Sequence, residues 1–325
     1  MTTARQFEAM YAATWAALER LLDEAEGGAK HYDGAALATL YRRSCEHLAL
    51  ARARAYPIHL TQRLESLTER AHRQIYRPQG FALGQLRDFA LVDFPQAVRA
   101  HRGYLLVAAA LFLLPMLALA WASWRDPGFI LHLLDARQVR QFDAMYGPGP
   151  GGIGRERPAD TDWEMFGFYI MNNIGIGFQC FAAGIFAGVG SAFYLVFNGL
   201  FIGAVGGYLI TRGHAENFLS FVATHSAFEL TAIVLAGAAG LRLGHAVLAP
   251  GRLGRLAALQ HGARDAVVVV YGAAALLVVA AAVEAFWSSA RWVAPAVKYG
   301  VAAACWLLVI GYLAWQGRPE DARAG

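Results

Sequence analysis

A long run without a single charged side chain, residues 165–210, constrains this chain more than any other feature. About 20 apolar residues are enough to cross the hydrocarbon core of a membrane, so this run is long enough for two crossings. Charged residues make up only 16% of the 325-residue chain, whereas soluble proteins carry about 25%. The sequence therefore predicts a protein that lies largely in lipid and excludes an ordinary water-soluble enzyme.

The charges are also unevenly distributed. Residues 1–102 hold 25 of the 52 charged side chains (28 Lys and Arg plus 24 Asp and Glu), which predicts a polar head joined to a membrane body. The net charge is +4, and no basic run with interleaved aromatic residues occurs, so nucleic acid is not an expected partner. Cys45, Cys180 and Cys305 are too scattered to form a disulfide framework. The N-terminus lacks the apolar core of a signal peptide.

The head is expected to contain three amphipathic helices. Residues 4–26 place Phe7, Trp15 and Leu22 on one stripe, and Gly27 stops that helix. Asp33 can cap a second helix that ends before Pro57, and a third follows to residue 75. Because about 75 residues is near the lower limit for an independent core, we expect the head to pack on the membrane body, on a second subunit, or on both.

Beyond the head, apolar segments predict an all-α polytopic membrane protein of about six transmembrane helices with an N-terminal cytoplasmic helical domain. The expected spans are 103–124, two helices dividing the uncharged run near Gly188, and then 217–240, 266–288 and 292–315. The expected parts are a head (1–82), an interfacial helix (83–102), the first span (103–124), an outer loop (125–163), a core of three spans (164–245), an inner loop (246–264), the last two spans (265–316) and a tail (317–325).

Arginines predict the orientation, since cytoplasmic loops of membrane proteins are enriched in them. With both termini in the cytoplasm, seven arginines lie inside: Arg99, Arg102, Arg242, Arg252, Arg255, Arg264 and Arg318. The outer loop carries five arginines as well, but it is long and also acidic. The bacterial inner membrane is the expected location.

Glycines recur at helical spacing within the expected spans, where they let helix backbones approach closely in lipid. We expect them to pack helices within one subunit in preference to joining two subunits. The glycines are Gly184, Gly188, Gly199, Gly203, Gly207, Gly240 and Gly244.

Polar side chains inside the spans form the candidate site, because such groups are costly in lipid and normally face a partner or water. His225 and Glu229 are four residues apart and share one helix face. Three interpretations stay open: a hydrogen-bonded clamp between helices, which we favour, a transport or proton relay role, and catalysis. The predicted cluster comprises Asn172, Asn173, Gln179, Asn198, His225 and Glu229.

No metal or other cofactor is expected, because one histidine and one glutamate are too few for a zinc site. His214 lies near the start of its span, two to three turns from His225. Glu284 is expected at the outer end of the fifth span, and Lys298 is expected to extend its ammonium toward the membrane surface.

Several motifs resemble the stage II sporulation protein M family. They are Met171-Asn-Asn-Ile-Gly-Ile-Gly-Phe, Phe181-Ala-Ala-Gly-Ile-Phe-Ala-Gly188, Val196-Phe-Asn-Gly-Leu-Phe-Ile-Gly203, Thr224-His-Ser-Ala-Phe-Glu-Leu230 and Ala236-Gly-Ala-Ala-Gly-Leu-Arg-Leu-Gly244. The resemblance is strongest over 165–245 and extends to the first span.

The resemblance implies a polytopic inner-membrane protein, and in spore formers a membrane anchor or organiser that works with cell-wall hydrolases. The function expected first is therefore a non-enzymatic membrane scaffold, a homodimer with cell-envelope protein partners. A transporter or proton-coupled permease component is the second hypothesis, and an intramembrane metal-dependent hydrolase is the third.

Overall fold

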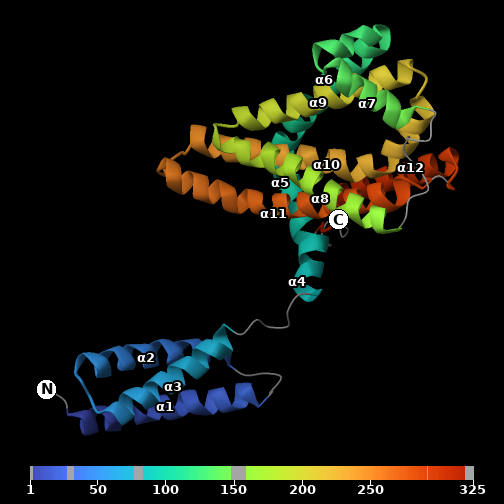
Figure 1. The fold of residues 1–325 in the computed structure, drawn as a ribbon. Helices are drawn as coiled ribbons and strands as arrows, with labels where there is room; N and C mark the ends of the chain where they lie inside the picture. Colours follow the sequence, from blue (N-terminus) through green and yellow to red (C-terminus); the bar gives the residue numbers. More distant parts are fainter. Residues whose placement is uncertain (1–2, 28–32, 77–82, 148–158, 291, 319–325) are drawn as a thin grey trace, which may run out of the picture. The chain divides into compact units, whose positions relative to one another are not determined.

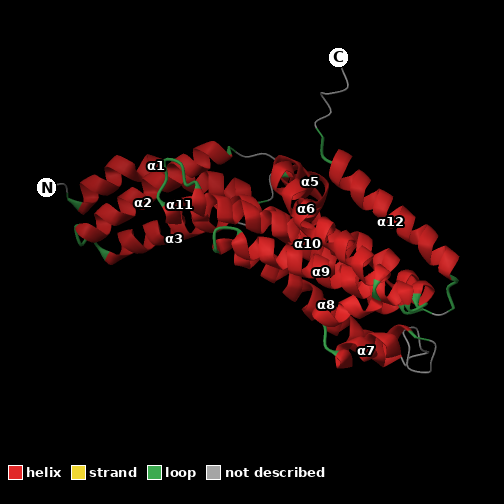
Figure 2. Ribbon diagram, turned by 90° about the horizontal axis from the view of Figure 1, so that it is seen from above, coloured by secondary structure: helices red, strands yellow, loops and turns green. Residues whose placement is uncertain are grey.

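The structure is a computed structural model that describes residues 3–27, 33–76, 83–147, 159–290 and 292–318. It divides into two compact units, Met1–Gly84 and Gln85–Gly325. Every regular element in the described part is a helix and none is a strand, as Figures 1 and 2 show. This confirms the prediction of an all-α polytopic protein.

The head consists of α1 (Ala4–Glu26), α2 (Gly34–Ala53) and α3 (Ile58–Ile75). The Thr3 side chain forms a capping box with Gln6 at the start of α1, and Asp33 accepts a hydrogen bond from Ala36 N at the start of α2. These bonds satisfy amide groups that the first helical turn leaves without partners. The three helices bury a core of their own: Phe7, Trp15, Leu18, Leu22, Leu37, Ala51, Leu60, Leu64, Leu67 and Ala71.

The second unit is a helical bundle. In chain order its elements are α4 (Leu83–Asp88), a π-helical turn (Phe89–Asp93), α5 (Phe94–Ala100), α6 (Arg102–Arg125), a 3-10 turn (Pro127–His132), α7 (Ala136–Tyr146), α8 (Ala159–Ala182), a second 3-10 turn (Ala183–Ile185), α9 (Val189–Thr211), α10 (Ala215–Leu248), α11 (Arg255–Ala282), a second π-helical turn (Val283–Ser288) and α12 (Pro295–Trp315).

Five described helices are long and apolar enough to cross a membrane: Arg102–Arg125, Val189–Thr211, Ala215–Leu248, Arg255–Ser288 and Pro295–Trp315. The second expected span, the first half of the uncharged run, corresponds to α8, which is a helix packed against α10 and α11 but is not among these five. Its polar residues Asn172, Asn173 and Gln179 make it less apolar than the others.

The helices α10 and α11 reach further than the spans predicted at 217–240 and 266–288. The connection between these two helices, predicted as an inner loop over 246–264, therefore comprises only residues 249–254. Arg242 Nη2 lies 2.9 Å from Asp265 Oδ2, so an ion pair joins the two helices beyond the apolar segments.

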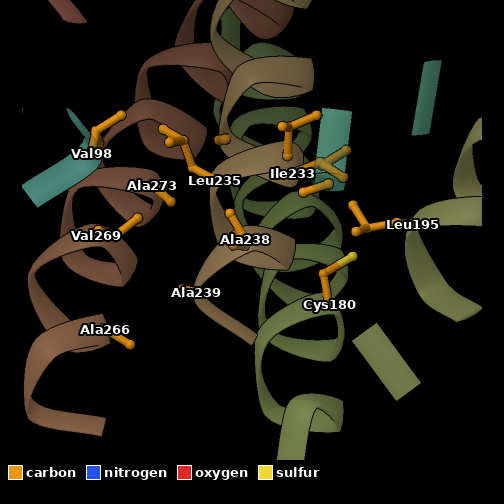
Figure 3. Packing of buried hydrophobic residues seen from close by; sticks show 14 of the residues in the cluster. Val98, Cys180, Leu195, Ile233, Leu235, Ala238, Ala239, Ala266, Val269 and Ala273 are labelled. Carbon is orange, nitrogen blue, oxygen red and sulfur yellow. The ribbon is translucent and has the colours of Figure 1, made fainter. Parts of the chain in front are cut away.

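The centre of the bundle is α10, which contacts α6, α8, α9, α11 and α12. Figure 3 shows Ile233, Leu235 and Ala238 of α10 between residues of α11 (Val269, Ala273) and residues of α8 and α9 (Cys180, Leu195). Many of these buried side chains are alanines, so the helix axes can lie close together.

Glycines make the closest helix contacts in the bundle. A Cβ added to Gly199, Gly203 or Gly207 of α9 would overlap a backbone carbonyl oxygen of α6, at Phe112, Met116 or Ala120 respectively. A Cβ added to Gly184 would overlap the Gly240 carbonyl oxygen, and a Cβ added to Gly244 would overlap the Gly188 backbone nitrogen. Gly188 also has a φ of +80°, which L side chains rarely adopt, at the turn that leads into α9. These contacts all lie within one chain.

The two segments that flank α6 pack on the bundle. The first of these segments is the one predicted as an interfacial helix (83–102). Its residues Phe94 and Val98 are buried, and the Phe94 ring fills the space above Gly272 of α11. Its residues Leu86 and Leu91 are exposed. The outer loop folds into the 3-10 turn and α7, and its residues Ile130, Val139 and Tyr146 join a cluster with Leu209 and Phe221. Residues 148–158, the Gly/Pro-rich part of that loop, lie outside the described residues.

Candidate functional site

Three ionisable side chains meet beside the N-terminal half of α10, close to the middle of that helix. His225 and Glu229 share a face of that helix, with 3.8 Å between His225 Nε2 and Glu229 Oε2. Glu284 approaches them from the π-helical turn Val283–Ser288, and one ligand atom from each of the three residues lies within 4.8 Å of the others. We call His225, Glu229 and Glu284 the triad. It combines an imidazole with two carboxylates in a largely buried position.

The π-helical turn places Glu284. A π turn inserts an extra residue into the helix and so changes the direction of the side chains that follow it, which is why such turns are frequent at functional sites. Here it continues directly from the end of α11 at Ala282, runs from Val283 to Ser288, and contains both Glu284 and Ser288. These two residues are four apart, so one short segment presents two polar side chains to α10.

Further polar contacts orient the triad. Ser288 Oγ lies 3.0 Å from His225 Nδ1, on the opposite side of the ring from Glu229. Asn173 of α8 donates a long hydrogen bond of 3.5 Å from Nδ2 to Glu284 Oε2, and Asn172 Nδ2 donates to Asn173 Oδ1 at 3.0 Å. The site therefore joins α8, α10 and the end of α11.

A second layer comes from α12. Lys298 is only 6% exposed, and its Nζ donates to the backbone carbonyl of Ser288 at 2.8 Å. The prediction that Lys298 extends toward the membrane surface was wrong, because the carbonyl at the end of the π turn offers the ammonium a partner inside the bundle. Thr224, next to His225, donates to the Lys298 carbonyl at 3.3 Å.

Aromatic rings from α7 and α10 cover the histidine. The Phe221 ring stands edge-on to His225 at 5.3 Å between centroids, and Tyr146 of α7 lies 6.2 Å from Phe221. Asn217 Nδ2 donates to the Tyr146 carbonyl at 2.8 Å, which fixes the end of α7 on α10. Burial raises the pKa of the Tyr146 phenol well above its usual value, so this ring stays neutral. Tyr146 of α7 thus packs on the Phe221 ring that contacts His225.

The structure does not bring all the sequence-predicted residues together. His225, Glu229 and Asn173 are in the site, and Asn172 reaches it through Asn173. Asn198 donates to the Tyr194 carbonyl of its own helix at 2.8 Å, and Gln179 is exposed about two turns along α8 from Asn172. His214 lies 3.5 Å from Asp143 of α7 instead of meeting the triad.

Sequence reasoning missed Glu284 and Ser288 as members of the site. Glu284 is the one acidic residue in the otherwise apolar stretch 266–288, and a lone acid in a span is a functional candidate by default. Its spacing of four from Ser288 repeats the spacing of His225 and Glu229. That pattern is visible in the sequence, but the pairing of the two segments is not.

The comparison with protein families matches residues 108–289 to "Stage II sporulation protein M". The match covers more than half of the chain and contains all three triad residues. The chain belongs to the stage II sporulation protein M family. This confirms the family resemblance seen in the sequence motifs, and with the apolar helices it establishes a membrane protein of this family.

The head of this family member matches a second description, a domain of unknown function (DUF8413), over residues 5–77. That range covers α1–α3, so the division into head and body agrees with the two family matches. The chain matches no curated protein and no solved structure at a significant level.

Proposed function

We propose that this protein is a non-enzymatic membrane scaffold that holds its helical head at the cytoplasmic face of the bacterial inner membrane and organises cell-envelope proteins. The proposal includes a homodimer, both chain ends in the cytoplasm, and docking of partners through the head. The family membership and the separate compact head support a chain that combines an anchor with a docking module.

The observation that carries this proposal is the buried apolar centre of the bundle. Residues 232–240 of α10, the central helix, are all buried and all alanine, glycine, isoleucine, valine or leucine. They pack on apolar residues of the neighbouring helices. A solute or ion needs polar groups along its path, whereas residues 232–240, which follow the polar cluster at His225 and Glu229, offer no polar side chain. Such a body is suited to anchoring.

Photo-crosslinking of the full-length protein in bacterial cells tests the scaffold. A photoreactive residue replaces Met10 or Ile58, which are 60% and 72% exposed on the head, and the matched control replaces Leu307, which is 74% exposed on the apolar helix α12. We expect discrete protein adducts from the head positions and none from Leu307. If both head positions remain without a discrete adduct in cells that contain the correctly inserted protein, the scaffold proposal is wrong.

A proton-coupled transport role is the second candidate, and the two neighbouring carboxylates favour it. Glu229 has 18% of its side chain exposed, and Glu284 is half-buried. If the protein conducts protons, vesicles that contain it will dissipate an imposed pH gradient faster than empty vesicles. They will lose that ability in Glu284→Gln but not in Glu216→Gln, an exposed glutamate at the start of α10. Equal rates in filled and empty vesicles exclude this candidate.

A further inference from the structure

We propose that His225, Glu229 and Glu284 bind one divalent ion of the first transition row, such as Zn²⁺ or Mn²⁺. This inference does not depend on the scaffold proposal, because an anchor can contain a metal or lack one. It replaces the expectation of a metal-free site, which rested on a count of two ligands. The structure supplies the third ligand, Glu284, from a different helix.

The ligand atoms are close enough to share an ion. His225 Nε2 and Glu229 Oε2 are 3.8 Å apart, and the three ligand atoms all lie within 4.8 Å of one another. Atoms bound to one Zn²⁺ at 2.0–2.2 Å in a tetrahedral site are about 3.3–3.6 Å apart. His225 Nε2 and Glu229 Oε2 are already close to that separation, and rotation of the glutamate side chains has to close the wider gaps by up to about 1.5 Å.

The groups around the ligands have the arrangement of an outer coordination shell. A histidine that binds a metal through one ring nitrogen usually holds the other with a hydrogen bond, which fixes its tautomer and orientation. Ser288 Oγ is 3.0 Å from Nδ1 and leaves Nε2 directed toward Glu229. Asn173 donates to Glu284 Oε2, so a carboxylate ligand is held as well.

Charge also favours a cation at this place. Two carboxylates close together in a site of low dielectric constant repel each other unless protons or a positive ion compensate them. Among the described residues, the ion pair formed by Glu229 is with His225, and no lysine or arginine is paired with Glu284. A divalent ion between the two carboxylates compensates both charges.

The ligand set indicates the class of ion. Imidazole suits Zn, Cu, Fe and Ni, and carboxylates suit Mg, Ca and Mn. One imidazole with two carboxylates therefore favours a first-row divalent ion over Ca²⁺ or Mg²⁺. Three protein ligands also leave a coordination position open, as in catalytic zinc sites and unlike closed structural ones.

The test measures metal binding to the purified full-length protein in lipid nanodiscs after treatment with a chelator. Zn²⁺ or Mn²⁺ alone is added, and bound metal is counted by mass spectrometry while thermal unfolding is recorded. We expect one ion per chain and a higher melting temperature, because a ligand that binds only the folded state stabilises it. Glu284→Gln should weaken binding by about 100-fold and Asn173→Ala by about 10-fold.

Glu216→Gln is the matched control, since it removes an exposed glutamate from α10 and should bind metal like the wild type. If Glu284→Gln fails to fold, metal binding by Asn173→Ala and X-ray absorption of the metal-loaded wild type still test whether the triad binds the ion. The spectrum should show nitrogen and oxygen ligands only. Sulfur ligands would place the ion at Cys45, Cys180 or Cys305 and overturn the proposal, as would the absence of stoichiometric metal with either ion.

Discussion

The head and the membrane body bury different kinds of side chain. In the head, large side chains make up most of the buried core, among them Trp15, Leu18, Leu22, Leu37 and Leu64. Along the centre of α10 in the body, small residues prevail: Ala232, Ala236, Gly237, Ala238, Ala239 and Gly240. Water drives large apolar side chains together, whereas lipid is as apolar as the side chains themselves, so helices in a membrane depend on close backbone contact. The two units are therefore stabilised by different forces.

The head and the body also differ in where they place their charged and polar side chains. The head keeps its ion pairs at the periphery, for example Arg70 with Asp23 and Glu26 at 2.7 Å, where each pair contributes little. The body encloses its few polar groups, and His225 is only 4% exposed. Because an enclosed polar group is costly unless it has partners, the triad lies where α8 and the π-helical turn supply hydrogen-bond partners to it.

The largest effect is expected from removing the Trp15 side chain in the head. Trp15 is fully buried, and its Nε1 donates to His47 Nδ1 at 3.1 Å. Trp15→Ala should lower the free energy of unfolding of the head by about 3–5 kcal/mol. Hydrogen exchange of α1–α3 in the full-length protein measures this loss. Met10→Ala, at an exposed position of the same helix, should change it by less than about 0.5 kcal/mol, and equal losses in the two variants would contradict a core of large side chains.

A smaller loss of stability is expected in the body, where adding a single carbon atom to a glycine at a helix contact should destabilise the folded protein. Gly203→Ala places a Cβ against the Met116 carbonyl oxygen, and the resulting separation of α6 and α9 should cost about 1–3 kcal/mol. Gly300→Ala makes the same chemical change in α12 with nothing within 4 Å. It should be neutral or slightly stabilising, because alanine favours helix over glycine by up to about 1 kcal/mol.

Thermal unfolding of both glycine variants in the same lipid distinguishes close packing from a general effect of glycine. Close packing predicts a lower melting temperature for Gly203→Ala alone. A similar decrease in Gly300→Ala would show instead that the membrane body is sensitive to any added methyl group, and the contrast with the head would lose its physical basis.

Local features of the fold could be read from the sequence because they depend on neighbours along the chain. The cap at Asp33, the end of α1 at Gly27 and the glycine spacing of α9 are of this kind. The extra length of α10 was not predictable from hydropathy, since residues 241–248 include Arg242 and His245 and continue the helix beyond the apolar segment.

The candidate site was predictable only in part for the same reason. His225 and Glu229 share one helix, so their proximity followed from the helical repeat. Glu284 joins them through the pairing of α10 with the π turn of another segment, and Lys298 finds its carbonyl partner only after α12 has packed. Asn198 was predicted to join the site but does not, because its amide donates a hydrogen bond to the Tyr194 carbonyl of its own helix. Polar residues in a span therefore indicate that partners exist without saying which.

The smallest predicted effect, a loss of head stability in acid, follows from the buried histidine of the head. Trp15 Nε1–H is only a donor, so His47 Nδ1 has to accept its hydrogen bond and carry no proton. Burial lowers the pKa of His47 in the folded head, whereas in the unfolded chain it is about 6.5. The unfolded state then binds more protons than the folded state in mild acid. Head stability is complete above about pH 6.5 and falls below it, by at most about 1.4 kcal/mol per pH unit.

Unfolding of α1–α3 at pH 7.5 and pH 5.5, followed by hydrogen exchange with correction for the intrinsic rates, measures this loss. In His47→Gln, the amide oxygen can still accept from Trp15 but cannot bind a proton in this range, so the decrease between the two pH values should shrink. His59→Gln, at an exposed position of α3, should keep the wild-type decrease. If the decrease persists in His47→Gln and disappears in His59→Gln, the buried indole–imidazole contact is not the origin of the acid sensitivity, and the charged periphery of the head would have to account for it.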